Sequence, residues 1–197
     1  MRFVLASASP ARLATLRAAG VEPEVVVSGV DESTTTAPSP AELVLELARL
    51  KAHAVVASLD GDALVLGCDS MLELDGVALG KPADPDEARE RWRAMRGRRG
   101  VLHTGHVLLS PAGERAETAS AGVRFADVTD AEIDAYVATG EPLAVAGAFT
   151  VDGLGGWFVE SVDGDPHTVV GVSLPLLRRM LAELGLALAD LGYPAPG

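Results

Sequence analysis

The feature that most constrains this chain is the short apolar block at residues 63–68, ALVLGC, which Asp69 and Ser70 follow directly. A continuous apolar run of this length is typical of a buried strand in a parallel or central position of a sheet. Open α/β sheets bind their ligands beyond the carboxyl ends of such strands. The sequence therefore predicts a covered sheet with an acid, Asp69, at the end of a central strand, where a ligand would bind.

A second strand is predicted near the N-terminus, and it turns at once into a helix. Residues 3–6 are apolar, Ser9 is a favourable N-cap and Pro10 is a favourable first helical residue. The free N–H groups and the positive end of the helix dipole favour an anion such as a phosphate group there. Arg12 opposes that dipole, which suggests that it binds an anion. An ordinary turn with a solvated arginine is the alternative that this segment alone leaves open.

The rest of the chain alternates strand and helix patterns. Apolar runs predict strands at residues 25–27, 71–74, 77–79, 101–109, 116–125 and 157–159. Capping residues and apolar stripes predict helices whose N-caps are Ser39, Asp84, Thr129 and Ser173. No internal repeat or long linker separates these segments. We therefore expect an α/β fold in a single domain over residues 1–197, with a frayed tail at 191–197.

Three charged residues stand at the predicted ends or edges of these elements. Glu32 follows the strand at 25–27, where it either ligates a metal or lies in a solvated loop. Lys81 lies in a Gly-Lys-Pro turn and comes close to Asp69 if the hairpin at 71–79 forms. Lys51 either extends to water or points into a cleft, because it borders an apolar stripe. That stripe is predicted from Leu43, Leu47, Leu50 and Ala54.

Charge and cysteine content restrict the location and the partners. The formal net charge of −12 argues against binding to nucleic acid or to an anionic membrane. A small polyanion can still bind to such a protein, but only at a local cluster of cationic side chains or through a divalent metal. Cys68 is the single cysteine, which excludes an intramolecular disulfide and fits a reducing compartment. No signal-peptide pattern and no run of about 20 apolar residues is visible. We therefore expect a cytoplasmic protein.

The polar residues at predicted element boundaries suit the hydrolysis of a phosphoanhydride. Cations neutralise a polyphosphate and the charge on its leaving group, and carboxylates can hold Mg²⁺ or Mn²⁺ through oxygen ligands. The metal or a carboxylate then makes a hydroxide nucleophile accessible. The candidate residues are Ser7, Ser9, Arg12, Lys51 and Lys81 for the substrate, and Glu32 and Asp69 for the metal.

Eight short segments distributed across nearly the whole chain carry a further signal. They are LASASPAR at 5–12, DE at 31–32, KA at 51–52, GCDS at 67–70, GKP at 80–82, HTG at 103–105, AGA at 146–148 and GD to VG at 164–171. In these segments and in their order, the chain resembles the Maf family of nucleoside triphosphate pyrophosphatases, also called septum formation Maf-like proteins.

The resemblance implies a fold and an activity. The fold would be an elongated α/β protein with a mixed sheet, similar to inosine triphosphate pyrophosphatases, in which two lobes flank a cleft. The activity would convert nucleoside triphosphates to monophosphate and pyrophosphate with a divalent cation, which would clear unwanted nucleotides from the pool. Asp69 matches the proton acceptor of the family. The other polar cleft positions match Ser7, Arg12, Glu32, Lys51 and Lys81.

Three positions depart from the family pattern. Ala11 stands where relatives often have a first arginine, and Val145 and Asp152 replace the lysine and glutamine of pyrimidine-selective members. We therefore expect a broad or shifted base preference, and the sequence leaves open whether modified nucleotides are the substrates.

Two other functions remain open at this point. One is a nucleotide-binding regulator that arrests septum formation without turnover, and the other is a nucleotidyltransferase. The expected partner is a nucleoside triphosphate, and the candidate assembly is a homodimer.

Overall fold

The computed structural model describes residues 1–193 and contains one seven-stranded mixed sheet. The strand order is β2-β1-β3-β5-β6-β7, and β4 pairs with β3 outside this path. The strands are β1 (Phe3–Ala6), β2 (Glu24–Val25), β3 (Leu64–Leu74), β4 (Val77–Leu79), β5 (Arg99–Ser110), β6 (Gly113–Phe125) and β7 (Val159–Asp163). Only the pairs β1–β2 and β1–β3 are parallel among the described strands. The predicted mixed α/β sheet is confirmed, whereas the single-domain interpretation of residues 1–197 stays a prediction.

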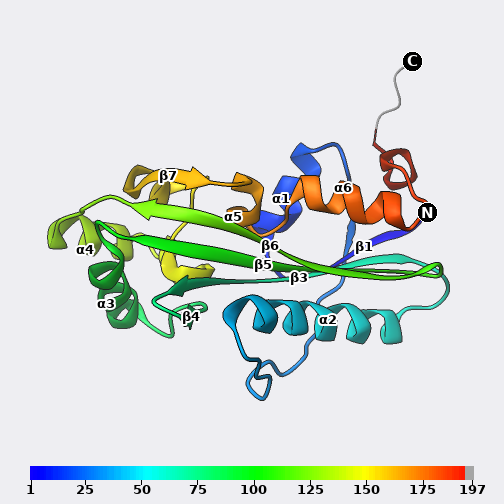
Figure 1. Cartoon of the computed structure of the whole chain (residues 1–197), viewed down its shortest axis with the longest axis horizontal. Helices are drawn as coiled ribbons and strands as arrows, with labels where there is room; N and C mark the ends of the chain where they lie inside the picture. Colours follow the sequence, from blue (N-terminus) through cyan, green and yellow to red (C-terminus); the bar gives the residue numbers. More distant parts are fainter. Residues whose placement is uncertain (194–197) are drawn as a thin grey trace.

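Helices cover both faces of the sheet, and the molecule is elongated (Figure 1). The helices are α1 (Pro10–Ala18), α2 (Pro40–Ser58), α3 (Pro85–Met95), α4 (Asp130–Ala138), α5 (Pro166–Val170) and α6 (Leu174–Glu183). Helix α2 packs on one face, and α1, α5 and α6 lie on the other (Figure 1). Helices α3 and α4 form a second core at one end of the sheet around Trp92 and Phe125. Short 3-10 helices complete the fold as η1 (Glu141–Ala144), η2 (Ala146–Ala148), η3 (Leu154–Phe158) and η4 (Leu188–Leu191).

Helix α2 rests directly on the backbone of the sheet. A Cβ atom at Gly67 of β3 would collide with the carbonyl oxygen of Ala48 and would lie 2.8 Å from the Cβ atom of Ala52. A Cβ atom at Gly105 of β5 would collide with the carbonyl oxygen of Val44. Two glycines on neighbouring strands therefore let the helix approach more closely than side-chain packing would allow.

This contact corrects the predicted apolar stripe of α2. Leu47 is buried as expected, but Leu50 is 42% exposed, and neither Leu43 nor Ala54 is buried. Small residues occupy much of the contact because the glycine-lined sheet leaves little space for leucine. The buried face of the helix consists of Val44, Leu47, Ala48, Lys51, Ala52 and Val55. Lys51 thus lies within the buried face rather than at its edge.

Other predicted elements need smaller corrections. The strand at 25–27 shortens to the exposed pair Glu24–Val25, because it lies at the edge of the sheet. Residues 157 and 158 belong to a 3-10 helix, and Trp157 is 86% exposed. In the tail predicted to fray, Leu191 is buried and ends η4, while residues 194–197 lie outside the described part. Asp69 and Ser70 lie inside the long β3 instead of ending a strand.

The predicted helix starts agree with the structure. Ser9, Ser39, Thr129 and Ser173 each accept a hydrogen bond from a backbone N–H in the first turn of the helix they cap. Asp84 does the same for α3. Within residues 1–193, no helix has the length and apolar character that crossing a membrane requires.

Candidate active site

The predicted site residues lie together. All seven of them line one cavity of about 680 Å³. Its lining comes from the β1–α1 turn, the loop before α2, the middle of α2 and β3, the turn after β4, and residues 141–152. The seven are Ser7, Ser9, Arg12, Glu32, Lys51, Asp69 and Lys81.

Arg12 connects the β1–α1 turn to distant parts of the chain. Its side chain is buried, and its Nε atom donates to the carbonyl oxygen of Gly171 at 2.8 Å. One terminal nitrogen donates to Ser7 Oγ and to the carbonyl oxygen of Cys68, and the other donates to Ser70 Oγ. No carboxylate pairs with Arg12 within residues 1–193. The guanidinium therefore brings an uncompensated positive charge to the cavity, but hydrogen bonds to the protein already orient it.

The β1–α1 turn has the cap geometry that the sequence predicts. Ser9 is in an extended conformation, its Oγ atom accepts from the Arg12 N–H at 3.5 Å, and Pro10 begins the helix. Ser7 Oγ accepts from the Ser9 N–H at 3.1 Å. Since the turn lines the cavity, the positive end of α1 faces the same space as the cationic side chains.

Lys51 joins the two acids predicted to bind a metal. Its Nζ atom lies 2.5 Å from Asp69 Oδ1 and 2.9 Å from Glu32 Oε1. The buried face of α2 directs Lys51 toward the sheet, and Asp69 stands opposite Gly105, on which the helix rests. Glu32 approaches from the loop before α2 and keeps a side chain that is 46% exposed. Two of the three charges are therefore buried, and the third belongs to a solvated loop.

Asp69 has the environment of a proton acceptor. It lies two residues beyond Gly67, the last residue of β3 that pairs with β1. Burial raises the pKa of Asp69 above its ordinary value, and the positive charges of Lys51 and Arg12 only partly offset this effect. A carboxylate with a raised pKa binds a proton more readily than an ordinary aspartate, which suits a general base.

Lys81 completes the cationic lining. The predicted hairpin forms between β3 and β4, and the turn after it places Lys81 at the cavity. The carbonyl oxygen of Gly80 accepts from the Gly147 N–H at 3.0 Å and from Arg91, which fixes this turn. Lys81 is exposed and forms no salt bridge within the described residues. Its charge is therefore free to meet a ligand.

The carboxylates fit a Mg²⁺ or Mn²⁺ ion only when the ligand supplies further oxygens. Glu32 and Asp69 converge on one point, which the Lys51 ammonium group occupies. No group of three or more His, Cys, Asp or Glu side chains could hold a metal ion within residues 1–193. Mg²⁺ is commonly held by one or two carboxylates together with phosphate oxygens and water. The donor set suits an ion that binds together with a polyphosphate.

Several contributors were not predicted from the sequence. Ser70 Oγ lies 2.8 Å from Thr104 Oγ1 and links Arg12 to β5. The carbonyl oxygen of Gly171 fixes the other side of the guanidinium. Glu141, at the start of η1, also lines the cavity. Their sequence signals were weak, because Ser70 and Gly171 appeared only as parts of family-like segments and Glu141 appeared in none.

Neither histidine of the family-like segments lines the main cavity. His103 is buried, and its ring nitrogens lie 2.7 Å from Ser120 Oγ and 2.9 Å from Glu73 Oε2. His167 lies beside Asp165 in the first turn of α5. Cys68 is buried, and burial raises the pKa of its thiol to about 11, which disfavours the nucleophilic thiolate.

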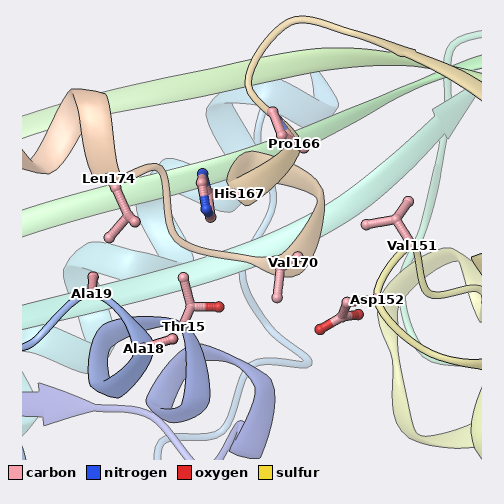
Figure 2. A pocket seen from close by; sticks show the side chains of 9 residues that line it. All are labelled: Thr15, Ala18, Ala19, Val151, Asp152, Pro166, His167, Val170 and Leu174. Atoms are coloured by element: carbon pink, nitrogen blue, oxygen red, sulfur yellow. The ribbon is translucent and has the colours of Figure 1, made fainter.

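A second, more open cavity has a volume of about 440 Å³ (Figure 2). The two cavities share Val151, Asp152 and Val170. Figure 2 shows Val151 and Asp152 on a loop across from Thr15 of α1 and Val170 of α5. Asp152, one of the positions that depart from the family pattern, therefore lines both cavities.

Comparison with known proteins agrees with the resemblance. Residues 2–184 match the family described as Maf-like protein. A protein from Salinispora tropica named nucleoside triphosphate pyrophosphatase is 61% identical, over 100% of this chain and 92% of that protein. One of the same name from Streptomyces coelicolor is 59% identical, over 98% of this chain and 96% of that protein.

Solved structures show a weaker likeness. A nucleoside-triphosphatase, described as a dITP/XTP pyrophosphatase, from Mycobacterium abscessus aligns with a TM-score of 0.40 and 19% identity, over 65% of this chain and 76% of its own. The Ham1 protein of Staphylococcus aureus aligns with a TM-score of 0.43 and 17% identity, over 64% of this chain and 72% of its own.

Proposed function

Since this chain belongs to the family of Maf-like proteins, we propose that it is a hydrolase that converts nucleoside triphosphates to the monophosphate and pyrophosphate. The observation that carries the proposal is the pairing of a buried carboxylate, Asp69, with Lys51 in a cavity that Arg12 and Lys81 also line. Three cations from separate elements match a triphosphate, and the carboxylate supplies a base. Close relatives that are named nucleoside triphosphate pyrophosphatases support the same activity.

In the proposed reaction, the protein orients the triphosphate and accepts one proton. The phosphates bind between Lys81, Lys51 and the N-terminus of α1, with the Arg12 charge behind that turn. Water attacks the α-phosphorus while Asp69 takes its proton, and we assign this role to Oδ2 because Lys51 donates to Oδ1. The bond from the α-phosphorus to the α–β bridging oxygen breaks, and pyrophosphate leaves. The fixed cations stabilise the charge that develops on the leaving group.

We also propose that the activity depends on a divalent cation. Glu32 and Asp69 would hold Mg²⁺ or Mn²⁺ together with phosphate oxygens, and the ion would neutralise charge on the triphosphate. Removal of nonstandard nucleotides from the pool and a role in cell-division arrest are further proposals that follow from the family resemblance. A cytoplasmic location and a homodimer stay predictions.

A substrate panel tests the proposed function. The purified chain is incubated with canonical and base-methylated nucleoside triphosphates, with Mg²⁺, Mn²⁺ or a chelator, and the products are separated by ion exchange. We expect monophosphate and pyrophosphate in equal amounts, and no reaction with the chelator. Release of orthophosphate would contradict the assigned bond cleavage. Binding without turnover would favour the septum regulator, and transfer of the nucleotide to a sugar phosphate would favour the nucleotidyltransferase.

A further inference from the structure

Glu141 accepts an unusual number of hydrogen bonds for a residue that lines a polyanion-binding cavity. Its Oε1 atom accepts from the Tyr136 hydroxyl at 2.8 Å, from Thr150 Oγ1 at 2.6 Å and from the Gly155 N–H at 2.9 Å. Its Oε2 atom accepts from the Leu154 N–H at 2.9 Å. Three of these four donors belong to residues 150–155, so one carboxylate fixes this loop at both of its ends.

The loop packs against that carboxylate without room for side chains. A Cβ atom at Gly153 would lie 2.5 Å from Glu141 Oε2, and one at Gly155 would collide with the Tyr136 hydroxyl. Partial burial by itself raises the pKa of Glu141, but the hydrogen bonds outweigh it and the net shift is downward. The carboxylate therefore stays ionised at neutral pH, and its charge is directed to the loop donors rather than to the cavity.

The same loop contributes to a part of the cavity lining that carries no cation. Thr150, Val151 and Asp152 line the main cavity, and the last two also line the second one. The cations Arg12, Lys51 and Lys81 come from other elements. A triphosphate is drawn to the cations and repelled by the Asp152 carboxylate, so the nucleoside is the part of the substrate that suits this loop.

We propose that Glu141 is a positioning residue that holds loop 150–155 in place for contact with the nucleoside part of the substrate. This inference rests on the proposed function, and it assigns Glu141 an effect on nucleoside binding but not on phosphate binding or on the chemical step. Loss of the carboxylate would leave two backbone N–H groups and two hydroxyls without their acceptor, and the loop would lose its fixed conformation.

The experiment compares two ligands that share the phosphates and differ in the nucleoside. The KM and kcat values are measured for the best triphosphate of the panel, and inorganic tripolyphosphate serves as a competitive inhibitor without a nucleoside. The variants are Glu141→Ala and Glu141→Gln. The matched controls are Glu160→Ala and Glu160→Gln, since Glu160 is a half-exposed glutamate of β7 that pairs only with Arg124 among described residues.

For Glu141→Ala we expect KM to rise roughly tenfold, which corresponds to about 1.4 kcal/mol of binding free energy, because a loop that is no longer fixed must be ordered when the nucleoside binds. The kcat value should change by less than about threefold, and the inhibition constant of tripolyphosphate should stay within about twofold. Glu141→Gln should give a smaller rise in KM, because its amide keeps one acceptor oxygen. The Glu160 variants should match the wild-type protein.

Two results would overturn the inference. One is an equal weakening of triphosphate and tripolyphosphate, and the other is a loss of kcat at unchanged KM. If Glu141→Ala does not fold, Thr150→Ala removes a single donor and should raise KM by roughly threefold. If the wild-type protein turns over no triphosphate, the proposed function fails, but calorimetry with a nonhydrolysable triphosphate and with tripolyphosphate still decides whether Glu141 affects only the former.

Discussion

The cavity has two sides that are built in different ways. The sheet side consists of the β1–α1 turn, α2 and β3, and its charged groups Arg12, Lys51 and Asp69 are buried. The turn side consists of residues 141–156, which form short 3-10 helices and a glycine-rich loop. The hydrogen bond from Arg12 to Gly171 joins residues that are 159 positions apart in the sequence. The hydrogen bonds of Glu141 to its loop join residues that are at most 14 positions apart. The comparison indicates that the groups assigned to the chemical step lie in the rigid core, and those assigned to nucleoside contact lie in a locally fastened segment.

The largest expected effect comes from Asp69→Asn on the sheet side. The amide cannot accept the proton of the attacking water, so kcat should fall by roughly 10²–10⁴-fold while KM changes little. Steady-state release of pyrophosphate measures the effect, and circular dichroism confirms that the variant is folded. Full activity of the folded variant would remove Asp69 from the role of proton acceptor.

The two sides should also differ in their contribution to stability. Arg12→Ala removes the side-chain donor to the carbonyl oxygens of Cys68 and Gly171 and one of the hydrogen-bond partners of each of two serine hydroxyls, which should lower the free energy of unfolding by about 3 kcal/mol. Glu141→Ala should lower it by only about 1 kcal/mol, because the Glu141 side chain is partly exposed and water can replace its oxygens for the exposed Leu154 N–H and the half-buried Thr150 hydroxyl. Urea denaturation at neutral pH measures both values. Equal losses would mean that the turn side is as much a part of the core as the sheet side.

His106 makes the stability of the sheet side depend on pH. Its Nε2 atom accepts from the Ser173 N–H at 2.8 Å, next to Val172 and the Arg12 partner Gly171, and burial lowers its pKa to about 4. Between pH 6.5 and 4 the unfolded chain binds more protons at this residue than the folded chain, so stability falls as the pH falls. The loss should be on the order of 2 kcal/mol between pH 6.5 and 4.5.

Urea denaturation across this pH range measures the slope, and His106→Gln should flatten it because glutamine does not titrate there. The absolute stability of that variant is expected to be lower at pH 7. An unchanged slope would show that other groups cause the pH dependence.

A smaller effect concerns the acid limb of the pH–rate profile. Asp69 must be deprotonated to accept a proton, so kcat should fall when the pH is lowered and Asp69 becomes protonated. Because the pKa of Asp69 is raised, this fall should occur at a higher pH than it would for an ordinary aspartate. Lys51→Met removes a positive charge that lowers this pKa, so the acid limb should move further toward neutral pH. The residual activity of the variant, measured from pH 4 to 9, gives the shift. A limb that moves toward lower pH would contradict the assignment of that limb to Asp69.

Local signals predicted the parts of the fold that depend on neighbouring residues. The caps at Ser9, Ser39, Thr129 and Ser173 were correct, because a side chain and a backbone N–H three residues later decide them. The stripe of α2 was wrong, because glycines on two distant strands decide which helix face fits the sheet. The apolar character of residues 157–159 predicts a strand, but residues 157 and 158 end a 3-10 helix that follows a glycine-rich turn, and only Val159 belongs to β7.

The site was predicted in the same uneven way. The sequence placed Asp69, Lys51 and Arg12 in one site, and the structure brings them to one cavity. The direct contact of Lys51 with both Glu32 and Asp69 was not predicted, because it depends on the close approach of α2. The role of Glu141 was not predicted from the sequence. Its partners Tyr136, Thr150 and Gly155 form no sequence motif, and they come together only in the folded chain.

The contact of α2 with Gly67 and Gly105 has a practical consequence for anyone who wishes to redirect this protein to new substrates. Backbone rests on backbone there, so no side chain acts as an adjustable spacer between Lys51 and Asp69. Even an alanine at either glycine would force the helix away and separate the pair. A variant library should therefore leave residues 44–69 and 105 unchanged. It should diversify the cavity-lining positions Val145, Val151 and Asp152, which belong to the side assigned to nucleoside contact, and keep Glu141 and the loop glycines.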